Sequence, residues 1–299
     1  MIKLTVLAIN HDKDGNDIVH VADKKTHNEQ LKTKGECQLE SGLSIIIETS
    51  NEKFLLDTGD SDLFLRNAKV LGVNPDELDT VILTHGHSDH SSGLSYLSEG
   101  KRVIMHPEGF HNRYRVRLKN EGTVGFPLPK EEAMQKFNFA LAKKPMKVYD
   151  NVLFLGEIPR KFPEEENIST TLDAELKISD PTLDDSGIAI KTEKGIIVMT
   201  GCGHAGIMNT CEYAKTVTGC NKIYAVLGGF HLVTPTVGAK TWEELEPRVN
   251  NTIAYMKNEG VEKFYLGHCV HEPVYSMFEK VFGKDNVIHL YSGGIFEID

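Results

Sequence analysis

Short apolar runs rich in valine, isoleucine and leucine recur along the chain, and most of them are bounded by glycine, aspartate or asparagine. This pattern is typical of β-strands. It predicts strands at residues 2–9, 43–48, 53–57, 80–84, 102–105, 151–155, 188–191, 195–200, 222–227, 263–266 and 286–290. In other segments apolar residues return every three or four positions, which is typical of amphipathic helices. These segments predict helices at residues 62–71, 91–97, 130–137, 206–217, 241–258 and 273–282.

The order of the predicted elements indicates the fold class. Strands follow one another in pairs in the first third of the chain, whereas strands and helices alternate in the last third. This mixture predicts an α+β chain in which helices cover sheets, in αβ/βα layers. The length of 299 residues is enough for one large domain or two small ones. Because residues 107–150 are richer in charged and aromatic side chains, we expect an inserted helical or lid segment there.

Composition and charge exclude several classes of protein. Apolar residues make up 40% of the chain and charged residues 25%, which is ordinary for a soluble globular protein. The net charge of −10, from 43 acidic and 33 basic residues, argues against nucleic acid or an anionic membrane as the main partner. No apolar run approaches the ~18 residues of a membrane span, and the short run at the N-terminus predicts a strand rather than a secretory signal. The five cysteines lack the spacing of a disulfide framework, so we expect reduced thiols in a cytoplasmic protein.

The strongest chemical signal is the sequence Thr-His-Gly-His-Ser-Asp-His at the end of one predicted strand. Neutral imidazole and carboxylate are ligands that zinc, manganese and iron accept. His85 and His87 can point toward one ion, and Gly86 between them allows a turn that a β-carbon would hinder. Asp89 and His90 fall on the next turn and can address a second ion. The alternative, a polar strand end with chance histidines, is disfavoured because four unpaired ligand groups tolerate burial poorly.

Two ions need more ligands than this segment offers, and three further histidines come just after predicted strands. They are His204, His231 and His268. Because loops at strand ends commonly carry function, we favour metal ligation over a surface position for His204 and His268, and leave both readings open for His231. The histidines without such a context are expected to be structural or exposed: His20, His27, His106, His111 and His289.

On these residues the chain resembles the metallo-β-lactamase superfamily. The His-x-His-x-Asp-His motif at residues 85–90 matches the metal signature of that superfamily, and residues 55–59 resemble the strand element whose aspartate, here Asp57, braces the histidine loop. The resemblance implies a four-layer αβ/βα sandwich, with residues 1–299 forming a single domain. It also implies that the first two histidines of the motif hold one metal, and that its aspartate and last histidine hold the other. His268 matches the last metal-binding histidine.

Four further segments resemble one branch of the superfamily, the dihydropterin–ribofuranosylaminobenzene phosphate synthase-like metallohydrolases. These segments are residues 41–44, 156–160, 200–207 and 228–232. The resemblance implies a metal-dependent hydrolase, or a transferase that releases pyrophosphate, acting on a small phosphorylated, pterin-like substrate. It also implies one or two divalent metal ions per chain as cofactors, with zinc expected first and manganese, iron or magnesium as alternatives.

The chain departs from the wider superfamily at two places. Most members carry a bridging aspartate after the strand that ends here at Thr200, whereas this chain has Cys202. Most also supply a third histidine to the first metal from the preceding segment, where this chain has Asp184 and Asp185. His204 could replace the missing histidine. Cys202 could be a thiolate ligand or a small buried hydrophobe, and both readings stay open.

The resemblance suggests roles beyond metal ligation. Asp89 is expected to act as a catalytic proton acceptor, and His231 as a catalytic and substrate-binding residue that donates a hydrogen bond to an oxyanion or phosphate. Arg160 is expected to bind an anionic part of the substrate. Basic residues of the insert could make phosphate contacts or form a solvated face: Arg113, Arg115, Arg117 and Lys119.

An alternative of a different class fits the same residues. Without the bridging aspartate, the chain could be a metal-binding, ligand-sensing module with weak or no catalysis. A redox di-iron site is disfavoured because no flavin or rubredoxin-like module follows within the 299 residues. We therefore expect a small-molecule partner, with no nucleic acid and no membrane, and leave a homo-oligomer open.

Overall fold

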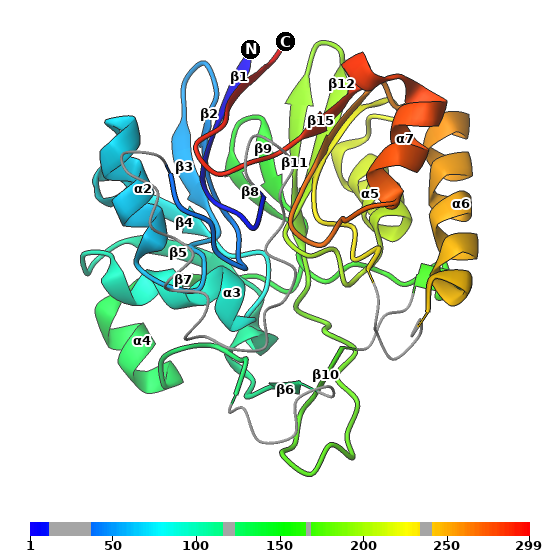
Figure 1. The fold of residues 1–299 in the computed structure, drawn as a ribbon. Coiled ribbons are helices and arrows are strands. Elements are labelled where there is room, and N and C mark those ends of the chain that lie inside the picture. Colours follow the sequence, from blue (N-terminus) through cyan, green and yellow to red (C-terminus); the bar gives the residue numbers. More distant parts are fainter. Residues whose placement is uncertain (12–36, 116–122, 166–168, 234–240) are drawn as a thin grey trace.

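Two large sheets lie face to face in the computed structural model, with helices on both outer faces (Figure 1). The structure describes residues 1–11, 37–115, 123–165, 169–233 and 241–299. Four residues named above therefore lie outside the described residues: His20, His27, Arg117 and Lys119.

The first sheet has the strand order β16-β1-β2-β3-β4-β5-β7. Its strands are β1 (Ile2–Ala8), β2 (Ser44–Glu48), β3 (Lys53–Leu56), β4 (Thr80–Ile82), β5 (Arg102–Met105), β7 (Asn138–Leu141) and β16 (Ile295–Ile298). The strands from β16 to β3 pair antiparallel, and those from β3 to β7 pair parallel. The pairing of Ile2 with Ile298 brings the two ends of the chain side by side (Figure 1).

The second sheet has the strand order β15-β14-β13-β12-β11-β9-β8. Its strands are β8 (Met146–Tyr149), β9 (Val152–Phe154), β11 (Gly187–Thr192), β12 (Gly195–Thr200), β13 (Ile223–Gly228), β14 (Lys263–Leu266) and β15 (Val287–His289). The strands β12, β13, β14 and β15 are parallel, so their carboxyl ends lie at one edge of the sheet. A separate two-stranded ribbon pairs β6 (Tyr114–Arg115) with β10 (Thr170–Thr171).

Helices cover the outer face of each sheet. They are α2 (Leu63–Leu71), α3 (Ser88–Ser91), α4 (Lys130–Lys136), α5 (Ile207–Thr218), α6 (Trp242–Asn258) and α7 (Val274–Phe282), with 3-10 turns at η1 (Pro75–Glu77), η2 (Ser92–Tyr96), η3 (Pro107–Phe110), η4 (Pro163–Glu165) and η5 (Lys284–Asn286). One cluster of buried side chains lies between the sheets. A second joins Phe64 of α2 to Val81 of β4, and a third joins Met256 of α6 to Val198 of β12. Burial of these apolar surfaces stabilises the four layers, and the predicted α+β sandwich is confirmed.

The structure differs from the predicted elements at the edges of the sheets. Residues 107–150 were expected to form an insert, yet they supply β7 to the first sheet and β8 to the second. Both are half-buried edge strands, so their apolar pattern is weak. The helix predicted at residues 91–97 is a single α-helical turn, α3, followed by the 3-10 turn η2. The expected insert is therefore narrower than the sequence suggested.

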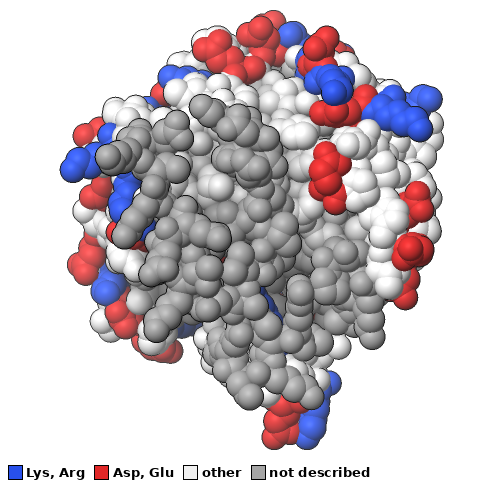
Figure 2. Space-filling model, in the orientation of Figure 1, with Lys and Arg blue, Asp and Glu red and all other residues white. Residues whose placement is uncertain are grey.

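Charged side chains of both signs lie on the face of the molecule that Figure 2 shows. Among the described residues, no helix combines the length and apolar character needed to cross a membrane. Figure 2 shows acidic and basic side chains interspersed around the rim of one face. Where residues are described on this face, neither sign forms an extended patch.

Candidate metal centre

Ends of neighbouring strands place the candidate residues at one edge of the two sheets. Asp57 follows β3, residues 85–90 follow β4, Cys202 follows β12, and His231 and His268 follow β13 and β14. Asp57, His231 and His268 have positive φ angles of 54°, 48° and 54°. Such angles are costly for residues other than glycine, and they persist where the surrounding structure holds them in place. Three strand ends therefore carry backbone strain at the same place where polar side chains gather.

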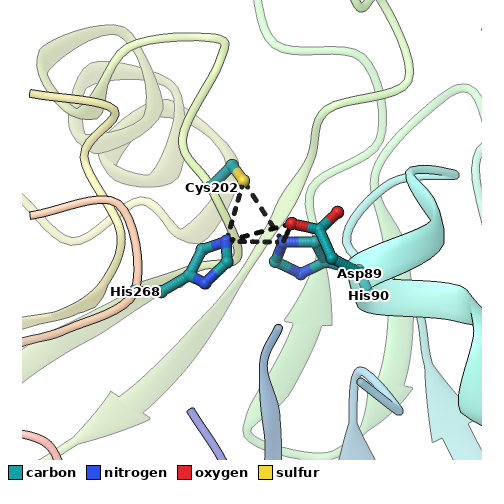
Figure 3. Close-up of side chains that lie close together, drawn as sticks. All are labelled: Asp89, His90, Cys202 and His268. Carbon is teal, nitrogen blue, oxygen red and sulfur yellow. Dashed lines mark hydrogen bonds and ion pairs between the residues drawn. The ribbon is translucent and has the colours of Figure 1, made fainter. Parts of the chain in front are cut away.

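One group of potential ligand atoms joins both halves of the fold. Its members are Asp89, His90, Cys202 and His268, whose ligand atoms lie within 4.8 Å of one another (Figure 3). His90 Nε2 lies 2.9 Å from His268 Nε2 and 3.2 Å from Cys202 Sγ. Cys202 Sγ lies 3.1 Å from His268 Nε2. Two imidazoles, a thiol and a carboxylate thus point toward one centre.

A second group shares the same sulfur. His85, Cys202 and His204 also place their ligand atoms within 4.8 Å of one another. His87 is adjacent, with its Nδ1 3.0 Å from His85 Nε2 and its ring centroid 4.8 Å from that of His204, but it belongs to neither group. The structure therefore brings together all six predicted ligands, and it places Cys202 between the two groups.

The protonation state of His85 and His204 suits metal ligation. Burial and the neighbouring imidazoles hold the pKa of both His85 and His204 well below its usual range, so both rings are neutral. Both ring nitrogens of His204 are buried without a hydrogen-bond partner in the described part of the chain. Buried polar atoms are rarely left so, and a metal ion is one reason for it. The donor set of nitrogen, sulfur and carboxylate oxygen fits zinc or iron.

Asp57 holds the histidine loop from beneath, as the resemblance implied. Its Oδ1 accepts a hydrogen bond from the backbone N–H of Thr84 at 2.7 Å, and its Oδ2 accepts one from the Thr84 hydroxyl at 2.8 Å. The same Oδ2 lies 2.7 Å from His90 Nδ1. Burial lowers the pKa of His90, but the carboxylates of Asp89 and Asp57 outweigh burial and raise it to about 9. The brace by Asp57 that the resemblance implied is therefore confirmed.

Charge is distributed unevenly among the ligands. Burial would raise the pKa of Asp89, but His90, His268 and Arg115 together lower it, so the carboxylate is ionised at neutral pH. Burial raises the pKa of Cys202 well above its usual range. Its Sγ lies 3.4 Å from that of Cys269, a second buried thiol at the site. A nearby cation would therefore be needed to hold Cys202 as a thiolate.

Arg113 is buried and does not form a solvated face. Its Nε donates to Asp180 at 2.6 Å, and its Nη2 donates to Asp184. Asp184 in turn accepts the backbone N–H of Gly86 at 2.8 Å. A β-carbon at Gly86 would lie 1.8 Å from the carbonyl oxygen of Gly109, so close approach, rather than an unusual φ, requires glycine. Arg113 thus holds the metal-binding loop through its Nε and Nη2 atoms.

Asp184 and Asp185 hold loops in place. Asp184 is bonded as described, and Asp185 Oδ2 accepts the backbone N–H of Ala205 at 2.8 Å. Asp185 Oδ1 lies 3.9 Å from His85 Nδ1. Neither carboxylate belongs to a ligand group. Both contacts fix the segments that carry ligands, because one partner precedes His87 and the other follows His204.

Of the two predicted substrate-binding residues, Arg160 lies against the His204 loop and His231 lies beside the ring of His204. Arg160 donates to the backbone carbonyls of His204, Pro181 and Thr182 at 2.8, 3.1 and 3.0 Å, so its guanidinium braces the His204 loop. His231 is buried, with its ring centroid 4.3 Å from that of His204. Burial lowers its pKa to about 4, which leaves a neutral imidazole beside the ligand groups.

The remaining histidines lie away from the ligand groups. His111 is exposed, His106 accepts the backbone N–H of Glu108 at 3.2 Å, and His289 stacks on Tyr275 at 3.9 Å between ring centroids. No sequence pattern indicated a role for Cys269 or the burial of Arg113. The position of Cys202 after β12 was the one available clue to its central place.

Comparisons with known proteins agree with this geometry. The family model described as the metallo-beta-lactamase superfamily matches residues 38–217. The 7,8-dihydropterin-6-methyl-4-(beta-D-ribofuranosyl)-aminobenzene-5'-phosphate synthase of Methanocaldococcus jannaschii is 30% identical over 276 residues, which cover 86% of this chain and 89% of that protein. An uncharacterized protein of the same organism is 32% identical over 197 residues, which cover 64% of this chain and 73% of that protein.

A solved structure shares the fold along the whole chain. It is the crystal structure of Tm1679, described as a metal-dependent hydrolase of the beta-lactamase superfamily. The two match with a TM-score of 0.77 and 24% sequence identity, covering 100% of this chain and 99% of that one. The four-layer arrangement therefore recurs in a protein whose sequence has diverged widely.

Proposed function

Since the chain belongs to the metallo-beta-lactamase superfamily, we propose that it is a metal-dependent enzyme acting on a small phosphorylated, pterin-like molecule. The reaction is hydrolysis or a transfer that releases pyrophosphate. The observation that carries the proposal is the convergence of Asp89, His90, Cys202 and His268 within 4.8 Å at the strand ends. The alternative, a ligand-sensing module without turnover, shares the metal site and is separated from the enzyme by the experiment below.

The two ligand groups would divide the metal ions between them. Asp89, His90, Cys202 and His268 would hold one ion, and His85 and His204 would hold a second, with Cys202 shared and His87 alongside. When bound, a divalent ion supplies Lewis-acid stabilisation of charge on a phosphoryl oxygen and on a leaving group. Zinc is the first expectation, with manganese, iron and magnesium as alternatives.

Residues in and around the ligand groups would orient the ligands, accept a proton and donate hydrogen bonds. Asp57 accepts from Nδ1 of His90, so Nε2 is the ring nitrogen that faces the ligand group. Asp89 is ionised and can accept a proton from an attacking group. His231, neutral because burial lowers its pKa to about 4, can donate a ring N–H to a phosphate or an oxyanion. Arg160 keeps the His204 loop in position.

The substrate class rests on the relative named as a synthase. That name describes a product with a pterin, a ribofuranosyl-aminobenzene and a phosphate. Arg115 adds positive charge near Asp89 and is half-buried on the ribbon, so it is a candidate contact for an anionic substrate. A single domain, a cytoplasmic location and the exclusion of nucleic acid stay predictions.

One experiment separates the candidate activities. The protein is loaded with zinc, manganese or iron and given two assays: hydrolysis of a nitrophenyl phosphodiester, and pyrophosphate release from a dihydropterin methyl diphosphate with a phosphorylated ribosyl-aminobenzene. We expect turnover in at least one assay, and loss of turnover and bound metal together in His268→Ala. The exposed His111→Ala is the matched control and should keep both. Tight binding of these molecules without turnover in either assay would support the sensing module instead.

A further inference from the structure

The packing of α6 on α5 has a fixed register. Tyr255 of α6 donates its hydroxyl proton to Glu212 of α5 at 2.7 Å, across 43 residues of sequence. Lys215 of α5 bonds to Glu259, just after α6, at 2.7 Å across 44 residues. Both helices lead from one parallel strand to the next, so they run in the same direction. Residues about 43 positions apart therefore face each other along the pair.

This register places Arg248 at the start of α5. Arg248 lies seven residues before Tyr255, which is about two turns and the same face of α6. Seven residues before Glu212 is Ala205, one residue after the ligand candidate His204. The side chain of Arg248 is therefore directed toward the N-terminus of α5, beside the metal centre.

Arg248 carries buried donors without acceptors. Its Nε and Nη2 atoms are buried, and no hydrogen-bond partner for either exists among the residues that the structure describes. Together these two atoms form one edge of the planar guanidinium, the edge that binds a phosphate or carboxylate in bidentate fashion. Leaving charged donors buried and unpaired costs stability, so such a group calls for an explanation.

The carboxylate of Glu165 does not supply the missing acceptor. Glu165 accepts the backbone N–H groups of Met208 and Asn209 in the first turn of α5, at 2.9 and 2.8 Å. Both of its oxygens are thus engaged by the helix. Within the described chain, no ion pair within 4.0 Å joins Glu165 to Arg248. The charge of Arg248 nevertheless acts on both Glu165 and His231, which places the guanidinium near both.

We propose that Arg248 binds an anionic phosphate group of the ligand, between the N-terminus of α5 and the metal centre. The site is continuous with the ligand groups, because the ring of His231 lies 4.3 Å from that of His204, and His204 shares a group with His85. The positive end of the α5 dipole favours an anion at the same place. This inference rests on the proposed function, which supplies the phosphorylated substrate class.

The groups beside Arg248 accommodate a second negative group. Burial raises the pKa of Glu165 to about 7, so its carboxyl group can take up a proton near neutral pH when an anion arrives. Arg248 offers this anion two parallel donors. Inorganic phosphate or pyrophosphate contains the minimum ligand that these groups would recognise.

The test compares Arg248→Met with Arg66→Met. Arg66 forms an exposed pair with Asp62 and is the matched surface control. Binding of inorganic phosphate and of pyrophosphate is measured by calorimetry on metal-loaded and metal-free protein, and melting is measured without ligand. We expect Arg248→Met to weaken phosphate binding at least about tenfold in both forms, because a charge-assisted bidentate contact is lost. Its melting temperature without phosphate should equal or exceed that of the wild type, since unpaired buried donors are removed.

Arg248→Lys guards against a folding defect. It keeps the charge without the bidentate edge, and it should melt like the wild type while losing part of the phosphate affinity. Equal phosphate affinity in the wild type, Arg248→Met and Arg248→Lys would overturn the proposal, as would a wild type that binds no phosphate. If Arg248 serves only as a distant counterion of Glu165, Arg248→Met lowers the melting temperature and leaves phosphate affinity unchanged.

The same data separate this inference from the proposed function. Arg248-dependent phosphate binding in a protein that turns over no substrate would leave the anion site standing and remove the enzymatic proposal. Turnover together with phosphate binding that is independent of Arg248 would support the enzymatic proposal and remove the anion site.

Discussion

The carboxylate of Asp57 lies 2.7 Å from Nδ1 of His90, while it also accepts two hydrogen bonds from Thr84. Asp57 is the residue after β3, and its backbone is held at a φ of 54°. A carboxylate in this position fixes the orientation and tautomer of the imidazole, so Nε2 faces Cys202 and His268. A residue that follows β3 therefore orients a ligand candidate in the loop after the neighbouring strand β4.

Asp57→Asn should weaken metal binding without removing a ligand. The amide can accept one hydrogen bond from Thr84 but cannot serve both His90 and Thr84 as a carboxylate does. Loss of such a partner costs about 10- to 100-fold in metal affinity. Competition with a chromogenic chelator measures the effect. The exposed Asp150→Asn should bind metal like the wild type, and an unchanged affinity in Asp57→Asn would show that the brace is not needed.

Cys202→Ser tests whether the shared sulfur is a ligand. Because Cys202 belongs to both groups, we expect the number of bound ions per chain, measured by elemental analysis, to fall. Serine is a poor substitute for a thiolate toward zinc or iron. The buried Cys211→Ser, on α5 away from the site, is the control and should keep the wild-type metal content. Full metal content in Cys202→Ser would return this cysteine to the role of a packed hydrophobe.

Arg113→Met should unfold more easily than the wild type. It removes one partner of two buried ion pairs and leaves the carboxylates of Asp180 and Asp184 without their cation. Breaking a buried pair costs about 3–5 kcal/mol of the free energy of unfolding. Urea denaturation measures this loss. In Arg66→Met, where the pair with Asp62 is exposed, the change should stay within about 1 kcal/mol, and an equally small change in Arg113→Met would contradict the network.

Glu165 should make stability depend on pH. Burial raises its pKa from 4.5 to about 7 despite two backbone hydrogen bonds, so the folded protein binds more protons than the unfolded chain between these values. The free energy of unfolding should therefore fall as pH rises from 4.5 to about 7, by on the order of 3 kcal/mol from this group.

The variant Glu165→Gln isolates this dependence. Its free energy of unfolding, measured in urea at several pH values across that window, should fall less steeply than that of the wild type. The exposed neighbour Glu164→Gln is the control and should keep the wild-type slope. Parallel slopes in all three proteins would show that Glu165 titrates normally.

The apolar pattern was sufficient for strands buried on both faces. β5, β12 and β14 begin and end where the sequence predicted, because each is an apolar run bounded by polar or glycine residues. β7 and β8 were missed because half-exposed edge strands keep polar side chains that dilute the pattern. Local sequence therefore defines the centre of each sheet better than its edges.

Only the part of the site that lies within a local sequence motif was predictable. Residues 85–90 carry a local signal, whereas the contacts of His90 with Cys202 and His268 span 112 and 178 residues of sequence. No local pattern reveals that one sulfur lies in two ligand groups. Arg113 and Arg248 look like ordinary surface charges in the sequence, since burial of a long basic side chain is decided by tertiary packing.

The parallel register of α5 and α6 also limits where residues can be inserted into or deleted from α6. A residue inserted or deleted between Arg248 and Tyr255 turns Arg248 by about 100° around the helix axis, while Tyr255 keeps its contact with Glu212. Such a change also turns the buried Leu245 by the same angle, so it disturbs the packing of α6 on the core as well as the position of Arg248. Length variation within this short stretch of α6 should therefore be rejected on both grounds, whereas the loops at the opposite ends of the strands can lengthen without turning Arg248.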